Sequence, residues 1–299
     1  MQYKSLPNTM PLVFVPRSIT NAAMLTYVLA LLACNMLYLR YALAWYWWLF
    51  GLAEVCGFFY FANHCTKQWA RISPMTFAKR LFGTALGIRI VYVLFSYWFY
   101  IAMTGAPFEF DAADVGFYNE LGRYGADLLR EGNWNLFPAF TAYSGADYSD
   151  LGYPFYLSFV YFLTDDSILI TRLLKAVWSA WTALLIYKLA ARNFGESTGR
   201  IAGILCMLMP NLIYYCGLHL KETEMVFLAV LFAERADYIL RRGKLAFGPT
   251  AALMLIPGAL FTIRTALAAV LVLAFLCALL LSSDRVVGGG RRILLVGVA

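Results

Sequence analysis

Charged residues are scarce in this chain. They account for 14% of its 299 residues, whereas soluble globular proteins carry about a quarter. Hydrophobic residues reach 62% and aromatic residues 17%. This balance excludes an ordinary soluble enzyme and a disordered protein. The fold class that it predicts is all-α, a polytopic bundle of transmembrane helices in a lipid bilayer.

Patterned cysteines are also missing. The sequence has 6 cysteines, but no CxxC pair and no Cys/His spacing typical of a zinc site. Most of them fall inside apolar runs, where a free thiol behaves as a small hydrophobic side chain. A disulfide scaffold is therefore excluded. The first apolar run, 21–39, is long for a signal peptide and lacks a cleavage motif, so we expect a retained membrane helix.

Long apolar runs are frequent. About 20 apolar residues cross the hydrocarbon core of a membrane, and eight runs qualify when snorkelling ends are counted. A ninth run begins at Ile293 and stops with the sequence, which predicts a chain truncated at its C-terminus. We expect an N-terminal pair of helices with a basic cytoplasmic loop (1–80) and a transmembrane core (81–299). The eight predicted spans are 21–39, 41–62, 81–103, 168–191, 201–218, 223–240, 247–263 and 265–282.

The distribution of charge predicts the orientation of these spans. The formal net charge is +7, but the basic residues lie in short loops, where they orient membrane helices. Nucleic-acid binding is therefore not expected. The loops predicted to be cytoplasmic are 63–80, 192–200, 241–246 and 283–292.

The segment 104–167 has the opposite charge, with ten of the 17 acidic residues. We expect it to form a large outer loop. Within it, 151–163 is too short to span and is predicted to lie on, or dip into, the outer face of the membrane. Apolar residues at helical spacing in 117–128 predict an amphipathic interfacial helix.

An acidic motif, FDAADVGFY, directly follows the predicted span 81–103. On a helix, Asp111, Asp114 and Tyr118 would share one face. A carboxylate held there could take a proton from a hydroxyl substrate. The alternative is structural, with Asp111 as a helix cap and Asp114 as an acid favoured by the helix dipole.

A second polar motif, HLKETE, separates two apolar runs. Lys221 is a natural point-charge partner for phosphate. His219 and Glu222 could ligate a divalent ion, although one histidine is a weak metal signal. The alternative is a short polar turn that caps two helices.

Several cations interrupt apolar runs. Arg264 lies between two predicted spans and is a candidate for function, because a cation in lipid is costly. Arg172 and Lys175 are expected to snorkel to the surface. Arg89 and Glu54, inside two other spans, could pair within the bundle.

The order of these motifs over about 81–282 resembles the GT-C fold of membrane glycosyltransferases. The similarity is to the bacterial protein O-mannosyltransferase and aminoarabinose transferase-like enzymes (family 39-like). Asp114 followed by Tyr118 matches the D-E-x-x-Y motif of the family, with Val115 in place of its Glu. The sequence LLREGNW, then Gly152-Tyr153-Pro154, then Leu220-Lys221-Glu222 follow in the family's order.

The resemblance implies transfer of a sugar from a polyprenyl-phosphate donor to a hydroxyl of a glycolipid, polysaccharide or protein. The reaction would occur at the outer face of a bacterial cytoplasmic membrane. Asp114 would be the general base, with Asp111 in support, while Lys221 and Arg264 would stabilise the leaving phosphate. Tyr118, Glu222 and His219 complete the expected substrate-binding set. A divalent metal ion is a possible cofactor, and no other is implied.

Two other functions are also compatible with the sequence. One is a polyprenyl-lipid transporter or flippase, which would need polar residues at mid-membrane and usually internal repeats. The other is a non-catalytic lipid-binding assembly subunit, which would explain the early end of the chain and the missing Glu. Because the polar motifs lie in outer loops and no repeat is visible, the sequence favours the enzyme.

Overall fold

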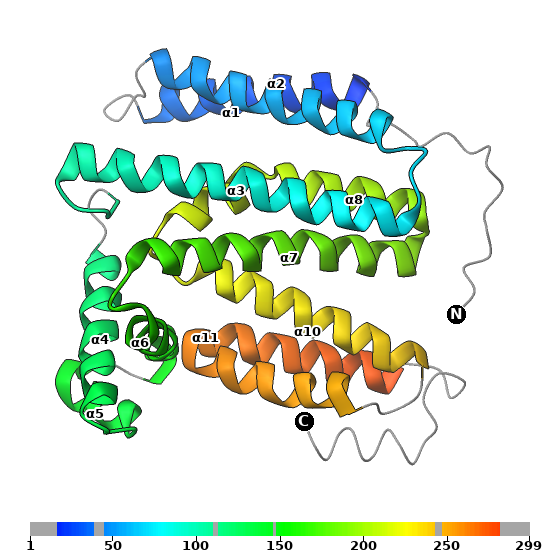
Figure 1. The fold of residues 1–299 in the computed structure, drawn as a ribbon. Coiled ribbons are helices and arrows are strands. Elements are labelled where there is room, and N and C mark those ends of the chain that lie inside the picture. Colours follow the sequence, from blue (N-terminus) through cyan, green and yellow to red (C-terminus); the bar gives the residue numbers. More distant parts are fainter. Residues whose placement is uncertain (1–16, 39–44, 110–112, 146–147, 243–246, 282–299) are drawn as a thin grey trace.

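The computed structural model describes residues 17–38, 45–109, 113–145, 148–242 and 247–281. All regular structure in these ranges is helical, which confirms the all-α fold class. The long helices lie side by side, and short helices cover one end of the bundle (Figure 1). The helices are α1 (Arg17–Leu37), α2 (Trp45–Gln68), α3 (Pro74–Thr104), α4 (Ala113–Arg130), α5 (Leu136–Ser144), η2 (Tyr148–Asp150), α6 (Gly152–Thr164), α7 (Ile168–Phe194), α8 (Glu196–Leu208), α9 (Pro210–Tyr214), η3 (Tyr215–Gly217), α10 (Glu222–Arg242) and α11 (Phe247–Leu281).

Helix α7 lies at the centre of the bundle, packed against α3, α8 and α10, and α10 in turn packs against α11. Ala176, Ala180 and Ala183 of α7 are fully buried. Their spacing places them on one helix face. Small side chains on such a face allow neighbouring helices to approach closely.

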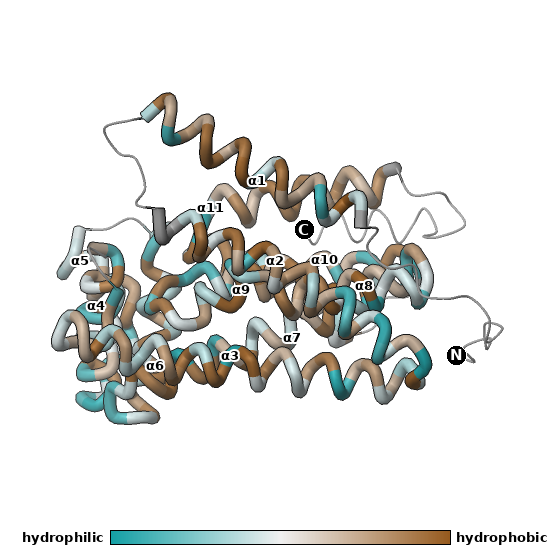
Figure 2. Tube along the Cα trace, turned by 90° about the horizontal axis from the view of Figure 1, so that it is seen from above, coloured by the Kyte–Doolittle hydropathy of each residue, from teal (hydrophilic) through white to brown (hydrophobic). Residues whose placement is uncertain are grey.

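Within the described ranges, four helices are long and apolar enough to cross a membrane. They are 18–37 of α1, all of α3 and α7, and 247–280 of α11. The bent pair of α8 and the segment 210–217 would make a fifth span if it is one crossing. This indicates an integral membrane protein. Hydrophilic segments gather in the region of α4 to α6 and at the opposite ends of the long helices (Figure 2).

The predicted total of eight spans is higher than this number. Helix α2 contains polar and aromatic residues that reduce its hydropathy, and α10 carries charged residues in its last turns. Arg264 has a non-helical backbone that interrupts α11. The two halves of α11 fold back on each other there (Figure 1), at the boundary predicted between 247–263 and 265–282.

Two predicted cytoplasmic loops are mostly helical. Helix α2 continues to Gln68, and α3 begins at Pro74 after the N-cap Ser73, so little of 63–80 is a loop. The loop expected at 192–200 shrinks to Gly195 between α7 and α8.

Arg200 stabilises the turn between α2 and α3, and it is only 5% exposed. Its guanidinium donates hydrogen bonds to the backbone carbonyls of Trp69, Ala70 and Ile72 and pairs with Glu196. These carbonyls follow Gln68, the last residue of α2, and buried carbonyl groups outside a helix need such partners. The charge pattern predicts Arg200 in a cytoplasmic loop, but its side chain is buried against this turn. The division of the chain at residue 80 remains a prediction.

The segment predicted as the outer loop forms an end region made of α4, α5 and α6, which lie at one end of the long helices (Figure 1). Helix α4 covers the predicted amphipathic stretch 117–128, and α6 covers 151–163. Helix α6 is not among the helices long enough to span a membrane. The interfacial position expected for these helices stays a prediction.

Close packing of α4 on α6 depends on glycine. A Cβ atom at Gly125 would lie 2.1 Å from Ser158 Oγ and 2.7 Å from the ring of Phe140, which is fully buried. A Cβ at Gly122 would meet Leu157 Cβ at 2.9 Å. Gly116, on the same helix, has no neighbour from the described ranges within 4 Å of such an atom.

We expect Gly125→Ala to destabilise the protein by about 1–3 kcal/mol, because the added methyl overpacks the α4–α6 contact. The matched control Gly116→Ala should be neutral or stabilising by up to about 1 kcal/mol, since alanine favours a helix over glycine. Thermal unfolding of both variants in one detergent measures the difference. Equal midpoints would contradict the tight α4–α6 packing.

Candidate functional site

The acidic motif lies at the start of the end region. Helix α4 begins at Ala113, which puts Asp114 in its first turn with an exposed side chain. Tyr118, one turn further on, is only 4% exposed and packs into a cluster with Tyr153. Asp111 lies outside the described residues. Asp114 is therefore open to a ligand and is also where the helix dipole favours an acid.

Lys221 of the second motif meets Tyr118 of the first. Its ammonium lies 5.4 Å from the centroid of the Tyr118 ring and forms an ion pair with Asp150 of η2. Burial by itself would lower the pKa of Lys221, but Asp150 and Tyr118 outweigh it and the pKa is raised. Lys221 is thus a fixed positive charge between α4, η2 and the start of α10.

Arg264 is exposed at the break in α11 and has no ion pair within the described ranges. A Cβ atom at Gly152 would lie 2.8 Å from the backbone of Thr262, so the tip of α11 touches the start of α6. Helix α11 also packs against η2, which carries Asp150. Arg264 therefore belongs to the same end of the bundle as Lys221.

Glu222 is the first residue of α10 and is half-buried. Its Oε2 atom is buried and has no hydrogen-bond partner among the residues that the structure describes. Among the described residues, no group of three or more His, Cys, Asp or Glu side chains could hold a metal ion. Glu222 and His219 are therefore not part of such a group in the described part of the chain.

His219 is completely buried and belongs to a side-chain network. Its Nε2 lies 3.0 Å from the hydroxyl of Tyr161, and that hydroxyl donates to Asn119 Oδ1 at 2.9 Å. The imidazole stacks on the Tyr161 ring. Because one ring nitrogen is used in this way, His219 links the turn before α10 to α6 and α4.

Stability should fall in mild acid because of His219. Its burial, together with the charges of Lys175, Arg172 and Arg123, holds the pKa of His219 well below 6.5. The unfolded chain takes up the proton near pH 6.5 while the folded chain does not, so stability is present above that pH and lost below it. The loss approaches about 1.4 kcal/mol per pH unit.

The variant His219→Gln removes this titration and keeps a polar side chain beside Tyr161. Its unfolding midpoint should fall less than that of the wild type between about pH 7 and pH 5.5. The midpoint of each protein across this range is the measurement. Parallel curves for the two proteins would show that other groups control the acid sensitivity.

The expectation that Arg172 and Lys175 snorkel to the surface is wrong, because both are fully buried. Lys175 donates to the carbonyl of Leu220 and pairs with Glu224 at 3.6 Å. Arg172 donates to the carbonyl of Pro107 and lies 3.5 Å from Glu109. Partners from other segments remove the need to reach water.

Arg89 is also buried, but not with Glu54, which is exposed. Its guanidinium donates to Ser179 Oγ at 2.7 Å and to the carbonyls of Met207 and Cys206 at 3.0 and 3.3 Å. These two carbonyls lie where α8 ends before Pro210. Arg89 therefore occupies the break between α8 and α9.

Two buried or half-buried acids, Glu109 and Asp150, were not singled out from the sequence, and Glu224 was noted only as a member of the HLKETE motif. Each pairs with a cation distant in the chain, namely Arg172, Lys221 or Lys175. No local spacing connects such partners. The only available signal was a carboxylate close to a predicted membrane segment, which also describes many solvated acids.

Comparison with known proteins adds no family to this picture. No protein-family model, curated protein or solved structure matches the chain. The fold and the apolar helices define an all-helical integral membrane protein with a polar cluster at one end. The likeness to GT-C glycosyltransferases rests on the sequence motifs alone.

Proposed function

We propose that the chain is a membrane glycosyltransferase that moves a sugar from a polyprenyl-phosphate donor to a hydroxyl acceptor. One observation carries the proposal. The exposed carboxylate of Asp114 stands one helical turn from Tyr118, and Tyr118 contacts the ammonium of Lys221. An acid that is open to a substrate and a fixed cation thus occur together, as transfer from a phosphate leaving group requires.

In this mechanism the acceptor oxygen attacks the anomeric carbon, and Asp114 takes the hydroxyl proton. The bond between that carbon and the phosphate oxygen breaks, and polyprenyl phosphate leaves with the electron pair. Arg264, exposed and unpaired within the described ranges, meets the phosphate first. A guanidinium can hold two phosphate oxygens at once. Lys221 adds positive charge, in competition with its present partner Asp150.

Position in the bundle also supports a lipid-linked donor. The polar cluster lies at one end of helices that are apolar enough to cross a membrane, among them α3, α7 and α11. A polyprenyl chain would run along their apolar surfaces while its phosphate stays at the end region. We place this end at the outer face of a bacterial cytoplasmic membrane, following the charge asymmetry of the sequence.

The direct test is turnover by the purified chain in lipid nanodiscs. A labelled sugar on polyprenyl phosphate is supplied with glycolipid, polysaccharide or peptide hydroxyl acceptors, and both the glycosylated product and the free polyprenyl phosphate are measured. Equal amounts of both support transfer. Donor binding without either product would point to the non-catalytic lipid-binding subunit, and the absence of binding would contradict the proposal.

A lipid transporter is the second candidate, because the span made by α8 and 210–217 is bent by 53°. Broken helices commonly form substrate sites in transporters. Here Arg89 already occupies the carbonyls at the break. Movement of the intact donor across a proteoliposome membrane, without loss of its sugar, would favour this candidate.

A further inference from the structure

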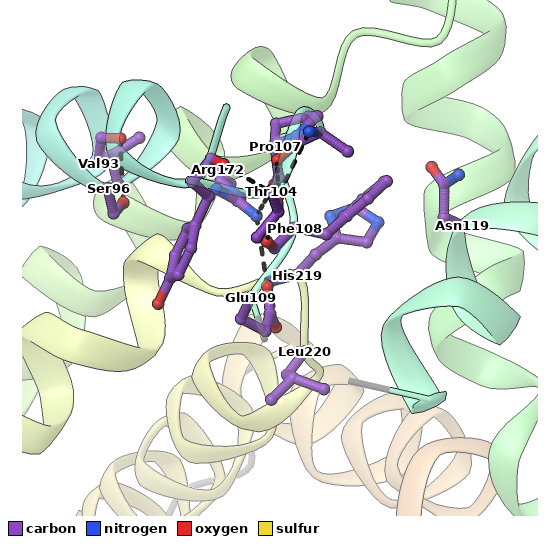
Figure 3. A network of polar contacts seen from close by, with 12 residues as sticks. Val93, Ser96, Thr104, Pro107, Phe108, Glu109, Asn119, Arg172, His219 and Leu220 are labelled. Carbon is purple, nitrogen blue, oxygen red and sulfur yellow. Dashed lines mark hydrogen bonds and ion pairs between the residues drawn. The ribbon is translucent and has the colours of Figure 1, made fainter. Parts of the chain in front are cut away.

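The short segment after α3 is tied to two other parts of the chain. Gly105, at φ 77°, ends α3 and lets the backbone turn. Arg172 of α7 donates to the carbonyl of Pro107 at 2.5 Å and lies 3.5 Å from Glu109 Oε2. The backbone N–H of His219 donates to the Glu109 carboxylate, at 3.2 Å to one oxygen and 3.4 Å to the other. Figure 3 shows Glu109 between Arg172 and His219.

This arrangement is buried. The side chain of Arg172 is 0% exposed and that of Glu109 is 8% exposed. Desolvating two charges costs free energy that their attraction offsets only with good geometry. A buried ion pair is therefore weak evidence for stability. Its role here lies in the positions of the residues that it holds together.

Glu109 connects the two motifs of the proposed site. It lies directly before the acidic motif that contains Asp114. Its carboxylate accepts a hydrogen bond from the backbone N–H of His219, which lies two residues before Lys221. The imidazole of His219 continues the connection through Tyr161 to Asn119, which follows Tyr118 on α4. The turn before α10 is thus held to both ends of the same motif.

We infer that Glu109 and Arg172 are positioning residues. Their ion pair fixes the position of the acidic motif relative to the turn 218–221. Glu109 and Arg172 touch no reacting atom in this scheme. They act through the backbone of His219 and through Pro107 on the placement of Asp114 and Lys221. The inference rests on the proposed function, because sugar transfer from donor to acceptor requires Asp114 and Lys221 to keep fixed positions relative to each other.

The test compares Glu109→Gln with Glu234→Gln. Glu234 is also a buried, ion-paired carboxylate, with Arg192 and Arg235 as partners near the C-terminal end of α7. Both variants should lower the unfolding midpoint. Only Glu109→Gln should reduce kcat, by about tenfold or more with little change in the KM for donor, because small misplacements of reacting groups are costly. Glu109→Asp, which restores the charge, should recover part of kcat.

Hydrogen exchange provides a readout that does not depend on activity. In the intact chain, Glu109→Gln should accelerate amide exchange about tenfold both at the start of α4 (113–119) and in 218–221, while Glu234→Gln leaves both unchanged. Arg172→Lys is the second variant if Glu109→Gln does not fold, with the same expectation.

The outcomes separate the two proposals. Equal kinetics and equal exchange in Glu109→Gln and Glu234→Gln would overturn the positioning role. Faster exchange in only one of the two segments would also overturn it, since a shared tether must release both. If the wild type has no transfer activity, the proposed function fails. Faster amide exchange of both 113–119 and 218–221 in Glu109→Gln would still show that Glu109 holds these segments together.

Discussion

Asp114→Asn should reduce sugar transfer by about two orders of magnitude or more, while the protein folds and still binds the donor. The amide has nearly the shape of the carboxylate but cannot accept the proton of the acceptor hydroxyl. Asp114 is exposed and forms no ion pair within the described residues, so its replacement should cost little stability. Initial rates at saturating donor, with the donor dissociation constant, are the measurements.

Asp127→Asn is the matched control for this result. Asp127 lies on the same helix, is 63% exposed, and pairs with Arg130. The same chemical change there should leave transfer near the wild-type rate, because Asp127 has no role in the proposed reaction. It should also cost little stability, since a surface ion pair contributes little to the free energy of unfolding. Normal turnover in Asp114→Asn with loss in Asp111→Asn would move the base to Asp111. Normal turnover in both Asp114→Asn and Asp111→Asn would mean that the acidic motif only caps a helix.

Arg89→Met should destabilise the protein by about 3 kcal/mol or more. The guanidinium is fully buried and donates hydrogen bonds to Ser179 Oγ and to the carbonyls of Met207 and Cys206. Methionine fills part of the volume but leaves these acceptors buried without a donor, at about 1–3 kcal/mol for each group. The midpoint of thermal unfolding in one detergent measures the loss.

Arg80→Met tests whether any loss of charge from α3 has this effect. Arg80 is on the same helix, exposed, and over the ring of Trp69 at 5.9 Å. Its replacement should change stability by no more than about 1 kcal/mol. A similar midpoint for the two variants would show that the break between α8 and α9 does not depend on Arg89.

The all-α class, the position of most helices and the end region between α3 and α7 could be predicted from the sequence alone. These features follow from local rules, because apolar composition and helical spacing act within a few turns of one segment. The interruption at Arg264 was also visible, since it divides two apolar runs. Asp114 and Tyr118 were placed on one helix by spacing alone, as the structure has them.

Which charged side chains are buried, and which partners they have, depends on how the helices pack together. Arg172 and Lys175 have the sequence context of snorkelling residues, yet Glu109 and Glu224, from segments far along the chain, let them remain inside. The contact of Lys221 with Tyr118 has the same origin. Whether a charge is stable in the interior depends on partners supplied by other helices. Hydropathy and periodicity describe one segment at a time, so they carry no information on that pairing.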